Sequence, residues 1–252
     1  MVTNKKVTLW LLSGKIIPIK SLKMNIIING GTRGIGKEVT LHMAEDINNK
    51  ILVTGRDEKA LKEISSPFTN VHPLRLDISS FDTQSDLFIK AVNSYFKGVD
   101  VLINMAGLLI ARDFTEITNK EARLIMETNF LGPAAVIRSI KPLMNKGSHI
   151  VNISSMGGFQ GSSKYKGLSY YSASKAALAC LSECLAAEFT DAGISVNCLA
   201  LGSVQTDMFE EAFPGQKAQV SPKEMAEYIS DFAMKGSRFY NGKVLPVAIN
   251  NP

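Results

Sequence analysis

Residues 25–36 read Asn-Ile-Ile-Ile-Asn-Gly-Gly-Thr-Arg-Gly-Ile-Gly, an apolar run that enters a glycine-rich turn. A short apolar run predicts a buried strand, and the helical spacing of Ile35, Val39 and Met43 predicts a helix directly after the turn. Glycines let the backbone approach a pyrophosphate closely, and the helix N-terminus offers unpaired N–H groups. The spacing is G-x-x-x-G-x-G rather than the commoner G-x-G-x-x-G. The segment therefore predicts a nucleotide-binding strand–turn–helix unit.

Strand-like and helix-like patterns alternate along the rest of the chain. Further strands are expected at 51–54, 71–76, 99–103, 149–154, 195–199 and 244–249. Helices are expected around Leu61 and Ile64 and at 81–96, 118–143 (bent near Gly132-Pro133), 171–190 and 221–232. Such alternation predicts an α/β fold in three layers, a doubly wound parallel sheet with helices on both faces. We expect one domain over 24–252, and a poorly ordered extension over 1–23.

The net charge of +5 does not indicate a nucleic-acid partner. Residues 1–23 hold five lysines and no acid, so the remaining 23 basic residues balance 23 acidic ones and create no field that attracts polyanions. Lys5-Lys6 before an apolar run imitates a signal peptide, but the run is short. No apolar run reaches the length of a membrane-spanning helix. A membrane or partner contact for residues 1–23 stays an alternative.

The cysteines and histidines do not form a metal-binding pattern. Cys180, Cys184 and Cys198 lack zinc-like spacing, and the three histidines stand apart. We therefore expect no metal. Cys180 and Cys184 lie four residues apart, so we expect both on one helix face as small buried apolar groups. Unpaired cysteines fit a reducing, cytoplasmic setting.

The end of the second strand bears on the choice of dinucleotide. A fold that binds NAD usually places an acid here, on the ribose 2′-hydroxyl, whereas this chain has Gly55 followed by Arg56. Arg33 in the glycine turn points to the same region, and arginine binds a phosphate group in bidentate fashion. We therefore favour NADP(H) over NAD(H). The alternative is that Arg56 is a solvated loop residue and Asp57 binds the ribose.

The stretch Ser169-Tyr-Tyr-Ser-Ala-Ser-Lys175 places a tyrosine and a lysine four residues apart at the start of a helix. Residues at this spacing share a helix face. A free tyrosine has a pKa of about 10, and a cation about 4 Å away in an effective dielectric near 20 stabilises the phenolate by about 4 kcal/mol. We therefore expect Lys175 to lower the pKa of Tyr171 toward working pH, as an acid/base catalyst requires.

From residue 25 to residue 247, the sequence resembles the short-chain dehydrogenase/reductase family, whose fold is Rossmann-like. The resemblance rests on the glycine turn, on Asp77-Ile78 and on Asn104-Met105-Ala106-Gly107. It rests also on Asn129, Ser155, Tyr171 with Lys175, and Gly202 with Thr206. It implies catalytic roles for four residues: Asn129, Ser155, Tyr171 and Lys175. It implies cofactor contacts for Gly30, Thr32, Arg33, Gly34, Ile35, Gly36, Arg56, Asp77, Ile78, Asn104, Ala106, Gly107, Tyr171, Lys175, Gly202, Val204 and Thr206.

Within these roles, Ser155 binds the substrate oxygen and Asn129 helps to hold a water in a proton relay that reaches Lys175. Asp77 and Ile78 contact the adenine, and residues 104–107 line the floor beneath the cofactor. Val204 and Thr206 hold the nicotinamide carboxamide. The long helices around Asn129 and after Tyr171 commonly form subunit contacts in this family, so a homodimer or homotetramer is expected.

The chain departs from the family pattern in several places. Asn29 stands where threonine is usual, Met105 replaces an asparagine, and Leu201 replaces a proline. The chain also lacks the usual final glycines. The interval from Thr206 to Pro222 is short for the segment that covers the substrate, so we expect an open pocket. Met208, Phe209 and Phe213 either cover the site or pack on the body of the fold.

The sequence thus predicts an NADP(H)-dependent oxidoreductase that interconverts a carbonyl and an alcohol of a small molecule, with Tyr171 as general acid/base. The alternative from another class is a non-catalytic dinucleotide-binding regulatory protein. Such proteins typically lose the tyrosine or the lysine, and this chain keeps both. A Rossmann-like methyltransferase would use the glycine turn but would not need Tyr171 and Lys175.

Overall fold

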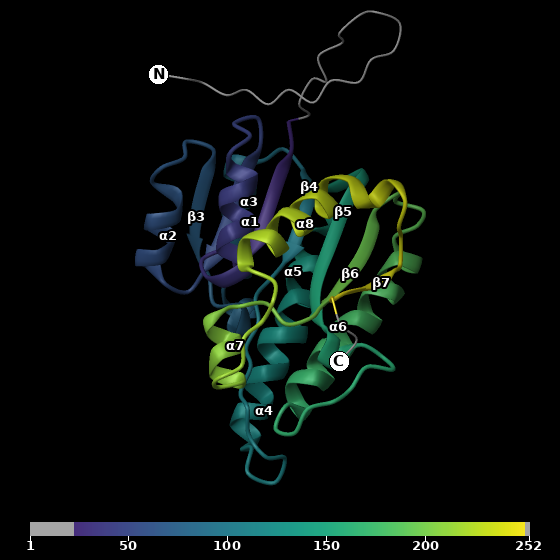
Figure 1. The fold of residues 1–252 in the computed structure, drawn as a ribbon. Helices are drawn as coiled ribbons and strands as arrows, with labels where there is room; N and C mark the ends of the chain where they lie inside the picture. Colours follow the sequence, from purple (N-terminus) through teal and green to yellow (C-terminus); the bar gives the residue numbers. More distant parts are fainter. Residues whose placement is uncertain (1–22, 250–252) are drawn as a thin grey trace, which may run out of the picture.

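The computed structural model describes residues 23–249, so the predicted extension over 1–23 lies almost wholly outside the described residues. Within the described part, seven parallel strands form one sheet in the order β3-β2-β1-β4-β5-β6-β7 (Figure 1). The strands are β1 (Asn25–Asn29), β2 (Lys50–Gly55), β3 (Val71–Arg75), β4 (Val99–Asn104), β5 (Met144–Ser155), β6 (Ser195–Leu201) and β7 (Val244–Val247). The predicted doubly wound parallel sheet is confirmed.

The helices connect these strands as crossovers. They are α1 (Gly34–Ala44), α2 (Glu58–Ser65), α3 (Ser85–Tyr95), α4 (Asn119–Met126), α5 (Gly132–Ile140), α6 (Ser169–Glu188), α7 (Asp207–Ala212) and α8 (Pro222–Lys235). Shorter helical turns are η1 (Ile78–Thr83), η2 (Glu127–Leu131), η3 (Lys141–Leu143), η4 (Met156–Gly158) and η5 (Gly236–Arg238). None of the helices between residues 23 and 249 combines the length and apolar character needed to cross a bilayer.

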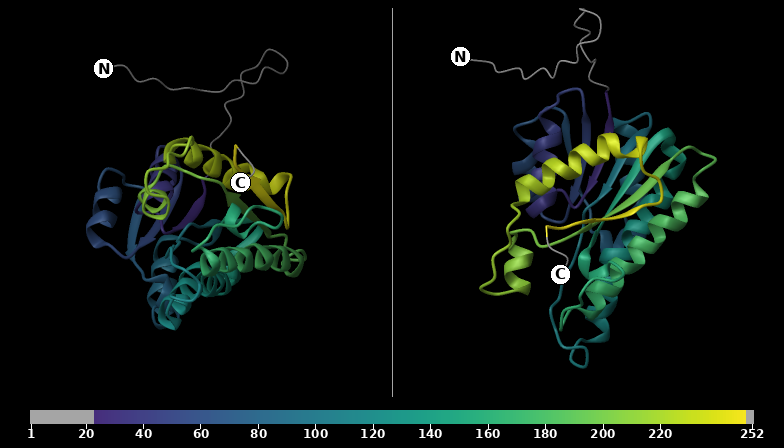
Figure 2. Two further views of the ribbon diagram at one scale, coloured as in Figure 1. Left: turned by 60° about the horizontal axis from the view of Figure 1, so that its bottom comes forward. Right: turned by 45° about the vertical axis from the view of Figure 1, so that its right-hand side comes forward.

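Alternating side chains of the strands build two apolar cores, one on each face of the sheet. Ile26 and Ile28 pack with α1, α2 and α8, whereas Ile27 packs with α3, α5 and α6. Figure 2 shows the resulting three layers from two further sides. Because both faces of the sheet are covered, side chains on both sides of the inner strands β1, β2 and β4 are buried, and most of them are apolar.

The predicted helix over 118–143 is continuous from Asn119 to Leu143, but its geometry changes along its length. Thr118 and Glu121 form a capping box at the start of α4, and the helix then widens into one π-helical turn, η2, before α5 resumes at Gly132. Pro133 lies in the first turn of α5, where its missing N–H costs least. The π-helical turn carries Asn129, and such turns frequently mark functional sites.

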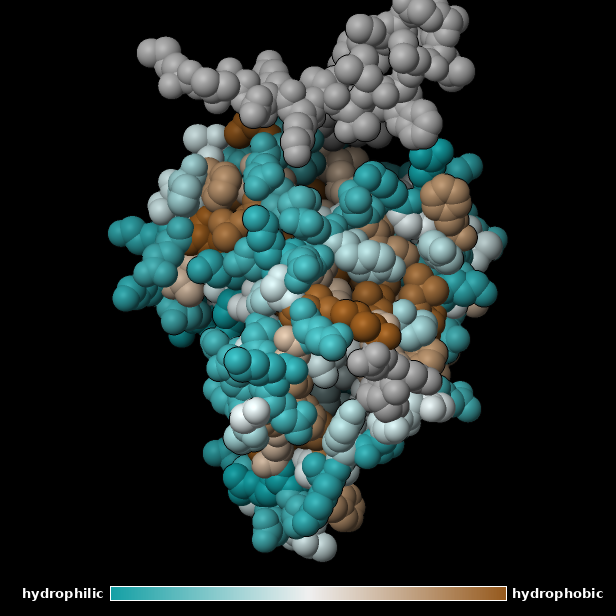
Figure 3. All heavy atoms as spheres, viewed as in Figure 1, coloured by the Kyte–Doolittle hydropathy of each residue, from teal (hydrophilic) through white to brown (hydrophobic). Residues whose placement is uncertain are grey.

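The expectation that Cys180 and Cys184 are buried is wrong for this chain: both are exposed, and only Cys198 is buried. The buried side of α6 is formed by other residues, among them Leu178, Ser182 and Ala186. The shared face of the two cysteines was predicted correctly, but that face points outward. The side of the molecule seen in Figure 3 is mainly hydrophilic, with apolar side chains gathered near its centre.

Candidate active site

The glycine turn lies at the carboxyl end of β1, where the strand order reverses between β1 and β4. Ligands of open α/β sheets bind at such a reversal. Gly30 has a φ of +85° and Gly34 a φ of +51°, both in the left-handed region. A Cβ added to Gly30 would lie 2.5 Å from the backbone nitrogen of Ala106. Glycine is therefore required for the turn to pack against the segment after β4.

The N-terminus of α1 is free to bind an anion. Arg33 occupies the N-cap position without a side-chain cap, and the first turn carries no acidic residue. Thr206 packs beside this turn, because a Cβ built on Gly34 would lie 3.6 Å from its methyl carbon. The unpaired N–H groups and the helix dipole suit a phosphate group. The structure therefore brings Gly34 and Thr206 together, although they are far apart in the sequence.

The end of β2 has no room for a ribose-binding acid. A Cβ on Gly55 would lie 2.6 Å from the side chain of Thr32. The carboxylate of Asp57 caps α2, where its Oδ1 accepts hydrogen bonds from the backbone nitrogens of Lys59 (2.8 Å) and Ala60 (3.1 Å). Arg56 and Arg33 are both exposed. These observations favour Arg33 and Arg56 over Asp57 as the residues that contact the ribose.

The predicted adenine contacts, Asp77 and Ile78, lie at the end of β3. Asp77 Oδ1 accepts hydrogen bonds from the backbone nitrogen and the hydroxyl of Ser79 at 3.0 and 2.8 Å. Ile78 is buried against Gly132, whose lack of a side chain permits the contact. The segment is therefore held by its own hydrogen bonds and by packing against the start of α5.

Lys175 is a buried cation fastened to β5. Its Nζ donates a hydrogen bond of 2.8 Å to the carbonyl of Ile153, and its own carbonyl accepts one of 2.8 Å from Ser154. Burial lowers the pKa of Lys175 to about 8, and the nearby Cys198 acts weakly in the opposite direction. A Cβ on Gly107 would lie 3.5 Å from Nζ, so the ammonium group reaches the floor beneath the predicted cofactor.

Tyr171 and Ser155 meet at the start of α6. The phenol of Tyr171 shares a hydrogen bond with the side chain of Ser155, which lowers its pKa, but burial has the larger effect and raises it. Lys175 is not among the causes of the change, and its Nζ donates instead to the carbonyl of Ile153. The expectation that Lys175 lowers the pKa of Tyr171 is therefore wrong for this structure, in which that pKa is raised. The Ser155 hydroxyl also accepts a bond of 3.1 Å from the nitrogen of Gly157.

Asn129 is fully buried, and its amide group is fully engaged. Its Oδ1 accepts from the nitrogen of Leu108 at 2.7 Å, and its Nδ2 donates to the carbonyl of Leu108 at 2.8 Å and to Ser174 at 2.9 Å. A Cβ on Gly107 would lie 3.9 Å from Asn129 Oδ1. The side chain thus holds the floor segment against α6, one residue away from Lys175.

Comparison with known proteins identifies this arrangement. The family model described as short chain dehydrogenase matches residues 24–217. The chain belongs to the short-chain dehydrogenase family. It is 30% identical to an NADP-dependent 3-hydroxy acid dehydrogenase of Schizosaccharomyces pombe, over 81% of this chain and 84% of that protein. It is 28% identical to an uncharacterized oxidoreductase of Staphylococcus saprophyticus, over 80% of this chain and 87% of that one.

Solved structures show the same fold. A dehydrogenase/reductase from Sinorhizobium meliloti is 26% identical and superposes with a TM-score of 0.77, over 89% of this chain and 93% of that chain. A short chain dehydrogenase from Burkholderia cenocepacia, solved in complex with NADP, is 21% identical with a TM-score of 0.79, over 90% and 96% of the two chains. The sequence resemblance to this family is confirmed.

In this short-chain dehydrogenase, the segment after β6 forms a short helix, α7, that the sequence analysis missed. Thr206 caps it by accepting a bond of 3.2 Å from the nitrogen of Phe209. Phe213, at its end, packs against Phe209 and edge-on against Tyr165, with ring centroids 5.3 and 5.4 Å apart. The aromatic residues therefore bridge to the loop before α6 rather than only to the body of the fold. The available signal was Thr206 as an N-cap residue followed by the acidic Asp207 and Glu210 in the first turn.

Gly202 and Val204 lie between β6 and α7. Gly202 donates from its nitrogen to the carbonyl of Val247 at 2.9 Å, and Val204 is buried and bridges to Val220. The segment is thus held by β7 on one side and by the residues before α8 on the other. No group of three or more metal-ligating side chains occurs among residues 23–249.

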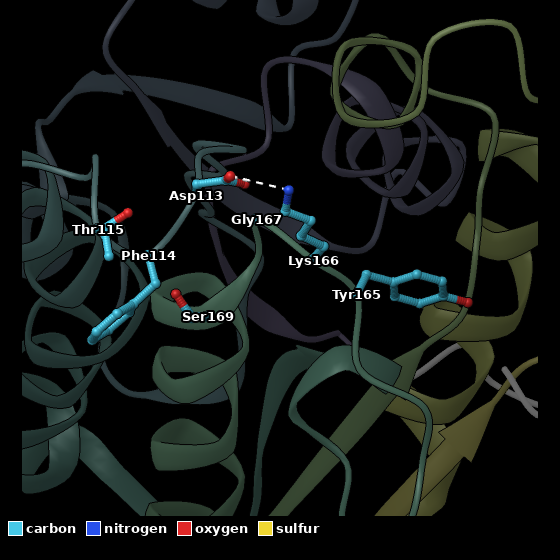
Figure 4. Close-up of a pocket in the computed structure, with 7 residues that line it drawn as sticks. All are labelled: Asp113, Phe114, Thr115, Tyr165, Lys166, Gly167 and Ser169. Atoms are coloured by element: carbon cyan, nitrogen blue, oxygen red, sulfur yellow. Dashed lines mark ion pairs between the residues drawn. The ribbon is translucent and has the colours of Figure 1, made fainter.

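A hollow of about 370 Å³ lies beside the N-terminus of α6 (Figure 4). Lys166 and Asp113 point toward each other across it and form an ion pair of 3.1 Å. The rings of Phe114 and Tyr165 point away in opposite directions. The lining residues are Asp113, Phe114, Thr115, Tyr165, Lys166, Gly167 and Ser169. Only Ser169, the first residue of α6, belongs to a motif of the sequence analysis; the others come from two loops without a motif.

Proposed function

We propose that this member of the family is an NADP(H)-dependent oxidoreductase that interconverts a carbonyl and an alcohol. Two observations carry the proposal: the hydrogen bond between Tyr171 and Ser155 at the start of α6, and the buried ammonium of Lys175, four residues further on, which lies beside Gly107 of the floor segment. The glycine turn packs against that same segment. An acid, an oxygen-binding hydroxyl and a cation are the groups that carbonyl reduction needs beside a hydride donor.

The residues fit NADP(H) better than NAD(H). The free N-terminus of α1 would hold the pyrophosphate, and Arg33 and Arg56 would hold the 2′-phosphate, since Gly55 leaves no space for a competing acid. The 30% identical relative from Schizosaccharomyces pombe is itself an NADP-dependent dehydrogenase, which supports the same choice. Asp77 and Ile78 would contact the adenine, the floor segment Asn104, Ala106 and Gly107 would lie under the ribose and nicotinamide, and Val204 and Thr206 would hold the carboxamide. The bound nicotinamide supplies the hydride.

The protein's own residues manage the proton. Burial keeps the pKa of Tyr171 above its ordinary value, so the phenol is protonated at neutral pH and can donate its proton to the carbonyl oxygen as that oxygen becomes an alkoxide. Ser155 would hold the same oxygen by a hydrogen bond. The ammonium of Lys175 would stabilise the phenolate that remains, because opposite charges attract strongly in a poorly solvated site. Asn129 would position Lys175 and the floor; a water relay at Asn129 stays a prediction.

We further propose a homodimer or homotetramer in the cytoplasm. The exposed face of α6 carries the uncharged Ala173, Cys180 and Cys184, and Leu131 before α5 is 44% exposed. A face of this composition suits contact with another copy, and free thiols suit a reducing compartment. Sedimentation analysis would report the assembly, and a monomer at micromolar concentration would contradict it.

The test is NADPH and NADH consumption over a panel of carbonyl compounds that includes 3-oxo acids. Tyr171→Phe should lower kcat about 100- to 10,000-fold while the NADPH dissociation constant stays within a few-fold of wild type. Tyr170→Phe is the matched control, because that ring stacks on Phe114 at 5.9 Å outside the proposed site, and it should retain activity. Near-wild-type turnover in Tyr171→Phe would refute the mechanism. NADPH binding without turnover on any carbonyl would favour the regulatory alternative.

A further inference from the structure

A row of buried polar side chains crosses the sheet beneath the proposed site. Asn29, Asn104 and Asn152 lie opposite one another on β1, β4 and β5, and Thr54 lies opposite Asn29 on β2. None of the four is more than 3% exposed. We call this set, together with Ser182 on α6, the asparagine row. It faces α6, because Ile27 and Leu102, two residues earlier on their strands, pack in the core on that side.

The hydrogen bonds of the row all run in one direction. Thr54 Oγ1 donates to Asn29 Oδ1 at 2.7 Å, and Asn29 Nδ2 donates to Asn104 Oδ1 at 3.3 Å. Asn104 Nδ2 donates to Asn152 Oδ1 at 2.8 Å, and Asn152 Nδ2 donates to Ser182 Oγ at 2.9 Å. The last hydroxyl fixes the direction: its one proton goes to the carbonyl of Leu178 at 2.7 Å, so it can only accept from Asn152.

One end of the row is bonded to the cofactor turn and the floor through the backbone, and the other end is bonded to the backbone of α6, the helix that carries Tyr171 and Lys175. The carbonyl of Thr54 accepts hydrogen bonds from the nitrogens of Gly30 and Gly31 at 3.0 and 3.1 Å, and the carbonyl of Asn29 accepts from Met105 and Ala106, both at 2.8 Å. At the other end, Leu178 lies three residues after Lys175 on α6, about one helical turn away. The row therefore joins the cofactor turn, the floor and the catalytic helix.

We propose that the asparagine row is a positioning element that couples cofactor binding at the glycine turn to the placement of Tyr171 and Lys175. The inference rests on the proposed function. Buried amides are stable only when their hydrogen bonds are satisfied, and aligned bonds of this kind strengthen one another. A change at one end of the row therefore alters the other end, and a shift of about 1 Å in a site of this kind costs about 100-fold in rate. Asn29, which departs from the family's usual threonine, extends the row to β2.

The experiment is a double-mutant cycle between the two ends, with Thr54→Val and Ser182→Ala, which remove only the terminal hydroxyls. NADPH affinity is measured by titration calorimetry without substrate, and kcat and KM separately with an accepted carbonyl. Ser182→Ala, far from the cofactor turn, should weaken NADPH binding three- to tenfold, and Thr54→Val should lower kcat by a similar factor. In the double mutant, the losses in NADPH affinity and in kcat should each be at least threefold smaller than the product of the losses in the two single mutants. The reason is that the second substitution acts on a row that the first has already interrupted.

The matched control is Ser230→Ala on α8. Ser230 is also a buried serine, but its hydroxyl has no hydrogen-bond partner among the described residues, and it lies on the other face of the sheet. Ser230→Ala should change neither the NADPH affinity nor kcat. Effects that simply multiply, or an unchanged NADPH affinity in Ser182→Ala, would overturn the coupling. If either end variant does not fold, as judged by thermal unfolding, Asn29→Thr takes its place and should also lower kcat; unchanged kcat would overturn the proposal.

The two proposals fail in different ways. If the wild-type chain binds NADPH and reduces carbonyls but the cycle is additive, only the coupling is wrong. If the chain turns over without dependence on Tyr171, the proposed mechanism is wrong, and the calorimetric cycle still decides the coupling. If the chain does not bind NADPH, both proposals are overturned.

Discussion

Lys175 is the residue whose surroundings decide most about the chemistry. Its ammonium group is buried, burial lowers its pKa to about 8, and its Nζ donates a hydrogen bond of 2.8 Å to the carbonyl of Ile153. A lysine with this pKa is mostly charged at pH 7 and mostly neutral at pH 9. A cation that must stabilise the Tyr171 phenolate would therefore be lost over this range.

The pH dependence of carbonyl reduction should follow from this. We expect kcat to be level below about pH 7 and to fall as the pH rises through about 8, because the charged form of Lys175 disappears. Lys175→Arg, whose guanidinium stays charged, should be slower at neutral pH but should lose this decline. A wild-type profile that stays level up to pH 10 would contradict the role of the lysine.

Arg56 should decide the preference between the two dinucleotides. A charge-assisted hydrogen bond contributes about 1.5–3 kcal/mol, so Arg56→Ala should raise the KM for NADPH roughly 10- to 100-fold and leave the KM for NADH nearly unchanged. Lys59→Ala is the control, because Lys59 is an exposed cation on the adjoining helix whose side chain is directed to Glu63 at 3.9 Å. Equal losses with both dinucleotides would argue against contact with the 2′-phosphate.

At the scale of elements, α8 depends on its N-terminal cap. Ser221 and Glu224 form a capping box, with Pro222 in the first turn, and the helix buries Ile229 and Phe232 against the sheet. Ser221→Ala should lower the free energy of unfolding by about 1 kcal/mol, measured by urea denaturation. Ser221→Asp, another good cap, should retain most of the stability. Equal losses in both variants would show that the cap hydrogen bond is not the cause.

The alternation of strands and helices could be predicted because each element has its own apolar period. The irregular elements could not. The π-helical turn at residues 127–131 carries Asn129, whose hydrogen bonds to Leu108 and Ser174 join residues far apart in the sequence, and no local pattern reports such contacts. The six-residue helix α7 buries no side chain fully, so it leaves no apolar period to detect.

The features of the candidate site also divide into those that the sequence could predict and those that it could not. Tyr171, Lys175 and Ser155 could be found because their chemistry fixes residue type and spacing on one helix and one strand end. The hollow beside Lys166, the bridge from Tyr165 to Phe213 and the exposure of Cys180 could not, because they depend on how loops and faces meet. The pKa of Tyr171 was misjudged for a related reason: burial, which no local pattern reports, exceeds the effect of its neighbours.

At the scale of the whole molecule, His149 links three parts of the fold. Its Nδ1 contacts the carbonyl of Ala233 on α8 at 2.9 Å, and since a carbonyl only accepts, Nδ1 carries the proton. Its Nε2 then accepts from Asn197 Nδ2 on β6 at 3.0 Å. Burial lowers the pKa of His149 to about 4. The fold therefore requires the neutral ring.

This requirement predicts how stability depends on pH. An unfolded histidine has a pKa of about 6.5, so the unfolded chain takes up a proton first as the pH falls. The contribution of the neutral His149 ring to the free energy of unfolding is fully present above about pH 6.5 and is lost progressively toward pH 4. We expect wild type to lose about 2 kcal/mol of unfolding free energy between pH 7 and pH 5, as measured by urea denaturation.

His149→Gln is the matched variant, because its amide can still donate and accept but cannot titrate in this range. It should be less stable at pH 7 and should lose clearly less stability between pH 7 and pH 5. His72, whose pKa is also lowered by burial and by Lys50, contributes in the same direction in both proteins. Identical pH dependence in the two proteins would therefore exclude His149 as the cause.

The strand order has a consequence for how the polypeptide reaches its native state. Ile26 of β1 pairs with Val101 of β4 as well as with Ile51 of β2, and each step between neighbouring parallel strands passes through a crossover rather than a hairpin. Contacts between residues distant in sequence must be made at the expense of loop-closure entropy, which slows folding. During synthesis, the first strand therefore leaves the ribosome long before its second neighbour exists. One edge of β1 is open to chaperones, or to the wrong strand, for all that time.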